Sequence, residues 1–327
     1  MGPLKSRKPE YNLRFRMELV RGLHNLSQRP KGCVLTVGNY DGVHLGHQTM
    51  IGVLKQRAAE LRSTATVLVF EPSSKEFIDP GGAPPRLTRW REKYLALAAQ
   101  GVDRLVTLGF DETMRAMTPE SFVERIVEGL GTRHIVVGND FRYGCNAGGT
   151  IDSLRAAGEA RGFGVEQIAP FVFDGVRVSS TAVRERLAQS DFAGAQRLLG
   201  RPYRMLGRVV HGSELGRTLG FPTANLRLMR RRPPVQGVMA VRVFGLAPQA
   251  LIAVASLGTR PTVDGTNMLL EVHVFDFAAD LYGREIQVEF VAKLRDELKF
   301  DSLDALIVQM KVDAAQARDL LSKVSCD

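Results

Sequence analysis

The stretch that decides the fold of the first half is Gly38-Asn39-Tyr40-Asp41-Gly42-Val43-His44-Leu45-Gly46-His47-Gln48. The apolar run at residues 34–37 predicts a short buried strand before it, and apolar positions between residues 50 and 61 recur at helical spacing after it. A strand therefore meets a helix through a turn that carries three glycines and two histidines. His44 and His47 are three residues apart, so they lie on one face of the first helical turn.

This turn has the chemistry of a phosphate site. A helix N-terminus presents N–H groups and a partial positive charge, which favour phosphate. The two imidazoles add donors where negative charge builds up in a phosphoryl or nucleotidyl transfer, and Gly46 lets a phosphate approach the backbone. The simpler alternative is that His44 and His47 only cap the helix or bind a metal ion.

The unit His44-Leu45-Gly46-His47 resembles the H-x-G-H signature of Rossmann-like nucleotidyltransferases. Residues 38–47 as a whole are similar to the subgroup that adenylylates flavin mononucleotide (FMN), which usually has Phe where Tyr40 stands. This resemblance implies that Gly38, Asp41, His44 and His47 bind ATP and that the two histidines are catalytic.

Length and composition limit the class of protein. A chain of 327 residues suffices for two domains, and 44% hydrophobic with 24% charged residues is ordinary for a soluble protein. A run of about 18 apolar residues is absent, so no membrane span or membrane partner is predicted. Residues 1–16 lack the apolar centre of a secretory signal and are predicted to be a disordered extension.

Charge and cysteine usage narrow the class further. The formal net charge of +9 suits an anionic partner. The only dense basic cluster is Arg227 with residues 230–232; it lacks interleaved aromatic residues, so we predict a solvated loop and no nucleic-acid partner. Cys33, Cys145 and Cys326 lie far apart, which excludes a zinc or disulfide framework and predicts a cytoplasmic location.

The rest of the first half alternates strands and helices. Residues 65–70, 101–106 and 135–137 predict strands, Thr88 is expected to cap one helix, and Thr118-Pro119 begins another. This alternation predicts a doubly wound α/β domain with a parallel sheet. Many relatives carry Pro-His-Pro after the second strand; here Ser73 and Ser74 follow Glu71-Pro72, so we assign this segment no chemistry.

Two further polar segments follow predicted strands or begin helices. Asp140 comes just after the buried strand 135–137, where ligands bind in open α/β sheets. Ser180 or Thr181 is expected to cap the helix at residues 182–187, beside Arg177. Both segments resemble elements of the same adenylyltransferase family, V-G-x-D-F-x-F-G and R-x-S-S-T-x-x-R, which implies that Asp140, Arg177, Ser180 and Thr181 bind ATP. The alternatives are a plain polar turn and an ordinary helix cap.

From residue 203 the pattern changes to several short strands joined by Gly/Pro turns, at residues 205–210, 238–244, 251–255, 269–277 and 286–291. Strands without intervening helices predict a closed antiparallel barrel. Residues 302–321 predict a C-terminal helix with one apolar face, made of Leu303, Leu306, Met310, Ala314 and Ala317.

A glycine-rich segment, residues 211–225, is the most informative part of this second half. Gly212, Gly216 and Gly220 allow tight turns near a phosphate, and Pro222 favours an extended chain after them. In an extended chain Thr223 and Asn225 point the same way, and two neutral oxygens together with ATP phosphates suit Mg²⁺. The Pro222-Thr223-Ala224-Asn225 motif looks like riboflavin kinase, which implies that this segment binds ATP and flavin.

Glu271 shares a strand face with His273 and Phe275, and a carboxylate there is a candidate base for an alcohol. The alternative is a surface salt bridge. The segment L-E-x-H-x-F-D-F around it, and the segment that contains Arg295, resemble riboflavin kinase, which implies that Glu271 is catalytic and that Arg295 lines the flavin site. The chain departs from that family at Ser256, where relatives have Asn, and at Met239, where they have Tyr.

The resemblance covers about residues 17–321 and implies a bifunctional enzyme that phosphorylates riboflavin and adenylylates the product to FAD. We expect an adenylyltransferase domain at residues 17–189, a linker at 190–202 and a kinase domain at 203–327, with ATP as co-substrate, Mg²⁺ as cofactor, and a monomer or weak oligomer in solution. Two alternatives stay open: an enzyme active in one half only, and a flavin- or nucleic-acid-binding regulator.

Overall fold

The computed structural model describes residues 17–25, 32–212, 216, 219–230, 232–262 and 265–323. Two compact units make up this part of the chain: one takes the described residues up to Arg184 together with Leu198–Gly200, and the other takes Glu185–Arg197 and the described residues from Arg201 onward. The predicted extension at residues 1–16 lies outside the described residues. Among the described residues, no helix is long and apolar enough to span a bilayer.

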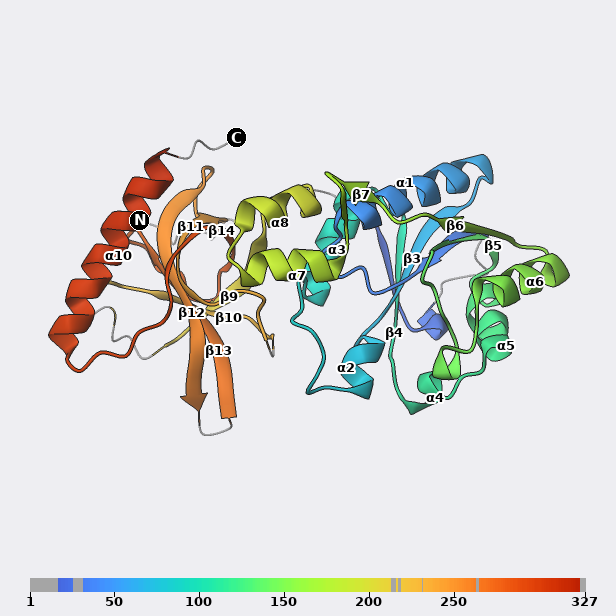
Figure 1. Ribbon diagram of the computed structural model, residues 1–327, viewed down its shortest axis with the longest axis horizontal. Coiled ribbons are helices and arrows are strands. Elements are labelled where there is room, and N and C mark those ends of the chain that lie inside the picture. Colours follow the sequence, from blue (N-terminus) through green and yellow to red (C-terminus); the bar gives the residue numbers. More distant parts are fainter. Residues whose placement is uncertain are drawn as a thin grey trace, which may run out of the picture. The chain divides into compact units, whose positions relative to one another are not determined.

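The described part of the first unit holds a six-stranded sheet in the order β1-β4-β3-β2-β5-β6, and every pairing in it is parallel (Figure 1). The strands are β1 (Glu18–Arg21), β2 (Cys33–Val37), β3 (Thr64–Phe70), β4 (Arg104–Leu108), β5 (Thr132–Gly138) and β6 (Gly164–Ile168). The predicted parallel α/β class is confirmed. The strand order reverses direction between β2 and β5, which is the switch point where α/β sheets bind ligands.

Helices cover both faces of this sheet because neighbouring residues of a strand point to opposite faces. On one face Leu35 and Val37 of β2 pack with residues of α5 (Pro119–Phe122), its π-helical continuation η2 (Val123–Glu128) and α6 (Ile151–Arg161). On the other face Val34 packs with residues of α1 (Leu45–Glu60) and α3 (Trp90–Ala99). The helices and short turns of the unit are η1 (Leu23–Asn25), α1 (Leu45–Glu60), α2 (Ser74–Ile78), α3 (Trp90–Ala99), α4 (Glu112–Arg115), α5 (Pro119–Phe122), η2 (Val123–Glu128), η3 (Cys145–Ala147) and α6 (Ile151–Arg161).

The structure confirms one of two predicted helix caps and contradicts the other. Thr118 caps α5 with Pro119 at the first position, as predicted. The prediction that Thr88 caps the next helix is wrong, because α3 begins at Trp90 with Arg89 at the cap. The hydroxyl of Thr88 instead accepts a hydrogen bond from the Gly42 backbone at 2.9 Å, so it fastens the turn before α1.

A short antiparallel pair, β7 (Val172–Phe173) and β8 (Val176–Arg177), precedes α7 (Ser180–Ala188) and α8 (Phe192–Leu199). The second unit then holds a closed antiparallel barrel in the order β10-β13-β12-β11-β14-β9. Its strands are β9 (Arg204–Val210), β10 (Ala224–Arg227), β11 (Gly237–Phe244), β12 (Leu251–Thr262), β13 (Gly265–Val274) and β14 (Glu285–Arg295). The predicted barrel is confirmed, and β10 adds a strand where only an extended chain was expected.

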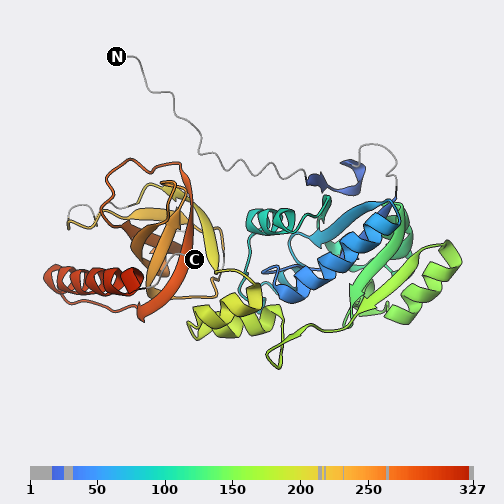
Figure 2. The same ribbon diagram turned by 90° about the horizontal axis from the view of Figure 1, so that it is seen from above.

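The C-terminal helix α10 (Leu303–Lys323) lies along the outside of the barrel in both ribbon views (Figures 1 and 2). Ala317 and Leu321 pack on Ala240 and Phe275 of the barrel wall. The predicted apolar face is therefore confirmed at its C-terminal end, whereas Leu303 at the other end is 56% exposed.

The predicted solvated loop around residues 227–232 needs a correction. Arg230 is buried, and its Nη1 donates a hydrogen bond to the hydroxyl of Tyr203 at 2.9 Å. Because a guanidinium is rarely buried without a polar partner, this contact makes Arg230 part of the barrel's structure.

Glu289 of β14 ties together three neighbouring strands. Its carboxylate accepts hydrogen bonds from Arg204 of β9 at 2.8 Å and from Arg242 of β11 at 3.1 Å. The side chains of Glu289 and Arg242 are 6% and 10% exposed. A mostly buried ionic cluster in the barrel wall therefore joins β9, β14 and β11.

We expect Glu289→Gln to lower the free energy of unfolding of the barrel by about 3 kcal/mol, because it leaves two arginines without their compensating charge. Urea-induced unfolding measures the change, and Glu112→Gln, at an exposed i,i+3 pair on α4, is the matched control. An unchanged unfolding midpoint for Glu289→Gln would show that the arginines do not depend on the carboxylate.

Candidate functional site

The first unit holds a cavity of about 710 Å³ at the carboxyl ends of its strands. It is lined by residues that follow β2, β3 and β5 and by the start of α7, so it lies at the switch point of the sheet. All eight residues of the first half that were predicted to bind ATP line this first cavity: Gly38, Asp41, His44, His47, Asp140, Arg177, Ser180 and Thr181.

The two histidines stand at the start of α1 as a stacked pair, with ring centroids 3.7 Å apart. His44 is the cap residue, and its Nδ1 accepts a hydrogen bond from the His47 backbone at 3.3 Å. A neutral imidazole that accepts at Nδ1 carries its proton on Nε2. Nδ1 of His44 therefore caps the helix, as the simpler alternative proposed. This cap leaves Nε2 of His44 as a hydrogen-bond donor.

Tyr40 departs from the Phe of the resembling family, and the structure shows what its hydroxyl does. The hydroxyl lies 2.7 Å from Oγ1 of Thr36, and the side chain is 1% exposed. Burial raises the pKa of Tyr40, so the phenol stays neutral. The ring packs against that of His47, with centroids 4.8 Å apart, and so helps to hold the histidine pair in place.

The carboxylate of Asp41 faces the protein rather than open solvent. It accepts hydrogen bonds from the backbone of Leu87 at 3.1 Å, from the backbone of Thr88 at 2.9 Å, and from Arg184 at 2.5 Å. Ser180 donates its hydroxyl to the Asp41 carbonyl at 2.8 Å. Asp41 therefore joins the turn before α1 to α7 and to the segment before α3.

The cap of α7 differs from the prediction. Ser179, and not Ser180 or Thr181, accepts the hydrogen bond from the Ala182 backbone at 3.1 Å. Ser180 and Thr181 are the first two residues of α7, where the backbone N–H groups have no partner within the helix. The predicted anion site at this helix start therefore keeps its backbone donors, with the cap one residue earlier.

Arg177 and Asp140 form an ion pair at 3.0 Å across the first cavity, with side chains 54% and 75% exposed. An exposed pair of this kind contributes little to stability, so a competing anion can take over the guanidinium. The guanidinium of Arg177 is therefore open to exchange of its anionic partner.

The segment that lacks Pro-His-Pro builds a helix start instead. Ser73 caps α2 and forms a capping box with Glu76. Arg86 pairs with Glu76 and, at 2.6 Å, with Glu71. Burial alone would raise the pKa of Glu76, but hydrogen bonds from Arg86 and Ser73 outweigh it and lower the pKa to about 2.

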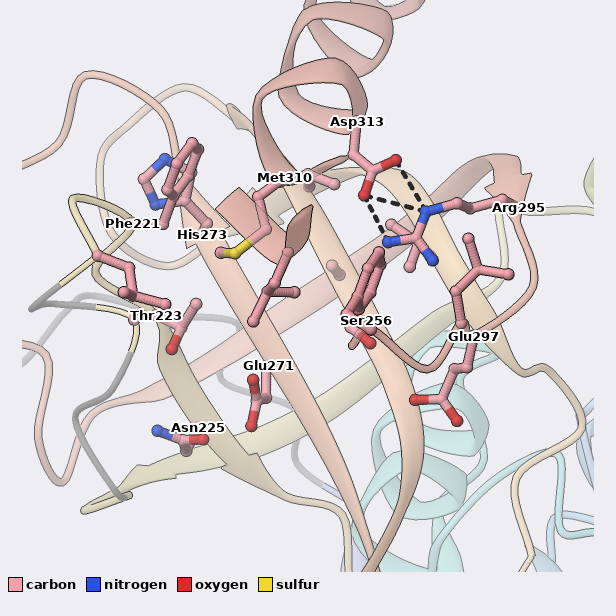
Figure 3. Close-up of a pocket in the computed structure, with 18 residues that line it drawn as sticks. Phe221, Thr223, Asn225, Ser256, Glu271, His273, Arg295, Glu297, Met310 and Asp313 are labelled. Atoms are coloured by element: carbon pink, nitrogen blue, oxygen red, sulfur yellow. Dashed lines mark hydrogen bonds and ion pairs between the residues drawn. The ribbon is translucent and has the colours of Figure 1, made fainter. Parts of the chain in front are cut away.

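The second unit holds a cavity of about 330 Å³ between the outer face of the barrel and α10 (Figure 3). Strand register places five of its lining residues in one row, since Asn225 pairs with Glu271, Glu271 with Ser256, Ser256 with Val238, and Val238 with Arg295. Figure 3 shows Thr223, Asn225 and Glu271 together on one wall of this second cavity. The predicted grouping of the acid with the Thr and Asn oxygens is present.

The predicted glycines divide into two groups. Gly216 lines the second cavity, with Thr223, Asn225, Glu271 and Arg295, whereas Gly212, Gly220 and Pro222 do not line it. Gly212 leaves room for the side chain of Asn225, because a Cβ at Gly212 would lie 2.1 Å from the Asn225 amide nitrogen. Pro222 is held by its carbonyl, which lies 2.9 Å from Nδ1 of His273.

Arg295 is fixed by a residue that sequence reasoning missed. Its guanidinium donates to the carboxylate of Asp313 on α10 at 2.9 and 2.7 Å, and Asp313 is 3% exposed. Met310 and Leu306, one and two turns before Asp313 on α10, line the same cavity. A charged residue inside the apolar face of the predicted helix was the available signal, because such a residue needs a buried partner.

Lys93 and Glu71 are the other missed residues, and both line the first cavity. Lys93 occupies a core-facing position of α3, one turn before Leu97. The buried face of this helix is made of Lys93, Leu97 and Ala98.

Comparison with known proteins gives a consistent set of relatives. Residues 26–182 match the FAD synthetase family model and residues 199–321 match the riboflavin kinase family model. Proteins named bifunctional riboflavin kinase/FMN adenylyltransferase are 49% identical over 306 residues in Pseudomonas fluorescens and 47% identical over 305 residues in Escherichia coli K12. These alignments cover 93% of this chain and 98% and 97% of those proteins.

A solved structure described as a macrolide-efflux protein from Streptococcus pneumoniae has a TM-score of 0.76 and 29% sequence identity to this chain. The alignment covers 92% of this chain and 99% of that one. This likeness shows that the fold of both units recurs in another protein.

We expect Asp41→Asn to destabilise the first unit by about 3 kcal/mol and to weaken ATP binding, because it leaves the largely shielded guanidinium of Arg184 beside a neutral amide and loosens the turn before α1. Thermal unfolding and ATP titration measure the two effects. Asp152→Asn, whose side chain is 85% exposed beside Arg155, is the control. Unaltered stability and affinity in Asp41→Asn would contradict the role of this ion pair.

Proposed function

This chain belongs to the family of bifunctional riboflavin kinase/FMN adenylyltransferases, and from that premise we propose which of its residues carry each reaction. It is a transferase that phosphorylates riboflavin to FMN with ATP and transfers an adenylyl group from ATP to FMN, giving FAD and pyrophosphate. The observation that supports the residue assignments is that each unit has its own cavity. The residues predicted for adenylyl transfer line the first cavity, and five of those predicted for phosphorylation line the second: Gly216, Thr223, Asn225, Glu271 and Arg295.

We assign adenylyl transfer to the first cavity. The phosphate of FMN is already anionic at neutral pH, so it attacks the α-phosphorus of ATP without a protein base, and pyrophosphate leaves. The protein's task is alignment and charge stabilisation. Nε2 of His44 donates toward the charge that develops on the phosphates, and His47, stacked on it, adds the second imidazole.

The remaining residues of the first cavity hold the triphosphate and the turn. Arg177 exchanges Asp140 for a phosphate oxygen. The backbone N–H groups of Ser180 and Thr181, at the start of α7, donate hydrogen bonds to the same anion. Gly38 lets the nucleotide approach the end of β2. Asp41 acts through the backbone, because its carboxylate is occupied by Arg184 and the segment at Leu87 and Thr88.

We assign riboflavin phosphorylation to the second cavity. An alcohol is a weak nucleophile, so the ribityl hydroxyl must lose its proton as it attacks the γ-phosphorus of ATP. Glu271 is the base in this assignment, since its carboxylate lines the cavity beside Thr223 and Asn225. Arg295, oriented by Asp313, faces the flavin.

The side chains of the second cavity suit Mg²⁺. Thr223, just before β10, and Asn225, on β10, line the cavity beside Glu271 of the paired strand β13 and offer neutral oxygens. Hard oxygen ligands are those that Mg²⁺ prefers. Gly212 leaves the space that Asn225 needs to hold this orientation. When bound with ATP, the ion neutralises phosphate charge.

The domain limits at residues 17–189, 190–202 and 203–327, a cytoplasmic location, and a monomeric or weakly oligomeric state without nucleic-acid or membrane partners belong to the same proposal. The scattered cysteines and the absence of a dense basic and aromatic stripe in the sequence support it. Incubation with riboflavin, ATP and Mg²⁺, followed by chromatography, tests the activities; formation of neither FMN nor FAD would refute both assignments.

We expect Glu271→Gln to lower riboflavin phosphorylation by about 100-fold or more, because the amide cannot accept the hydroxyl proton. FAD formation from supplied FMN should not change. Separate assays started from riboflavin and from FMN measure the two steps. If both steps fail together, the two reactions do not use separate sites.

The reciprocal variant is His44→Asn. Asparagine keeps a cap acceptor at the start of α1 but removes the Nε2 donor, so we expect kcat of adenylyl transfer to fall by about 100- to 1,000-fold. Phosphorylation of riboflavin by the same preparation serves as the internal control. Full FAD formation in this variant would remove His44 from the catalytic residues.

A further inference from the structure

A buried lysine in the first cavity has no role in the assignments above. Lys93 is 5% exposed, lies in the first turn of α3 and lines the cavity. Among the described residues, its ammonium group has no hydrogen-bond or ion-pair partner. Burying an ammonium group without a partner is costly, so a lysine in this position indicates a ligand that completes its contacts.

The charges around Lys93 are balanced without any ligand. Asp41 pairs with Arg184, and Arg86 pairs with both Glu71 and Glu76. These groups and Lys93 make three cations and three anions, and Asp41, Glu71, Arg86 and Glu76 all act on the lysine through their charges. Burial lowers the pKa of Lys93, while Asp41 and Glu71 raise it. A neutral ligand preserves this balance, whereas a phosphate would add uncompensated charge.

Glu71 presents the complementary group. Its Oε1 accepts from Arg86 at 2.6 Å, while its Oε2 is buried and, among the described residues, has no hydrogen-bond partner. Glu71 lines the same cavity as Lys93. The cavity therefore contains one donor and one acceptor, close enough to interact electrostatically, and each lacks a hydrogen bond.

We propose that Lys93 and Glu71 read the hydrogen-bonding edge of a substrate ring, with the ammonium group donating to a ring acceptor and Oε2 accepting a ring N–H. This rests on the assignment of adenylyl transfer to the first cavity and names two residues that select its substrates. Phe70, which precedes Glu71 and lines the cavity, supplies an apolar wall for a planar ring.

Both substrates of adenylyl transfer carry an edge of this chemistry. The flavin has a cyclic imide, with N–H flanked by carbonyl oxygens, and adenine has an amino group next to an acceptor nitrogen. The ring that occupies the pair is the one whose apparent affinity depends on both residues.

The first test is Lys93→Met in the full chain, which removes the donor and keeps the aliphatic length. We expect KM for one substrate, FMN or ATP, to rise about 10- to 100-fold, while KM for the other changes less than twofold. Lys55→Met is the matched control, because Lys55 is an exposed lysine on α1 that contacts the Gln100 carbonyl. Riboflavin phosphorylation by each preparation checks that the chain is intact.

The second test is Glu71→Gln, alone and combined with Lys93→Met. Because both residues bind one ring, Glu71→Gln should raise the same KM, and the double variant should lose less than the product of the two single effects. If Lys93→Met does not fold, Glu71→Gln alone tests whether this pair binds the ring. The proposal would be overturned if the two variants raised KM for different substrates, or if KM did not change in either variant.

Substrate analogues identify the ring. N3-methyl FMN lacks the imide N–H, and N6,N6-dimethyl ATP lacks the amino N–H of adenine. The unaltered enzyme should lose affinity for one analogue, and Glu71→Gln should lose no more for that analogue than for the parent nucleotide. Equal discrimination by both proteins against both analogues would refute the contact. Formation of FAD by the unaltered chain stands apart from this outcome and tests the function itself.

Discussion

Strand register is the constraint on which both sites depend, because it decides which side chains meet on one face. In the barrel, the pairing of Asn225 with Glu271, and of Glu271 with Ser256, fixes a row of polar groups on the outer face. A slip of one residue would turn the whole row into the barrel interior. In the parallel sheet, β2 and β5 pair side by side, so the segments that follow them enter the same cavity.

Charge pairs that are largely shielded from solvent then hold residues of both sites in place. Asp41 and Arg184 join the turn before α1 to the start of α7, and Asp313 orients Arg295 from α10. In both cases the carboxylate accepts hydrogen bonds from protein donors and so holds another segment or side chain in place. Positioning of this kind matters for phosphoryl and adenylyl transfer, where the protein contributes alignment and electrostatics more than covalent chemistry.

Much of the fold and most of the site could be predicted from local sequence. Apolar runs located β2, β3 and β5, and the short strands after residue 203 indicated the barrel, because these patterns depend on periodicity alone. The caps were less certain: Thr118 was correct, whereas Thr88 and Ser180 hold the turn at Gly42 and Asp41 instead of their helices. A hydroxyl near a helix start has several possible partners, and the sequence does not rank them.

The sequence by itself determined the two halves of the molecule, the histidine turn, and the Thr223–Asn225 pair, since each depends on residues close together in the chain. Tertiary structure alone decided that Lys93, Glu71 and Arg86 meet in one cavity and that Asp313 reaches Arg295. These contacts join residues from different elements. A charged residue in the sequence does not indicate which distant residue it will contact. Only packing, which makes an unpaired buried charge costly, selects which of them come together.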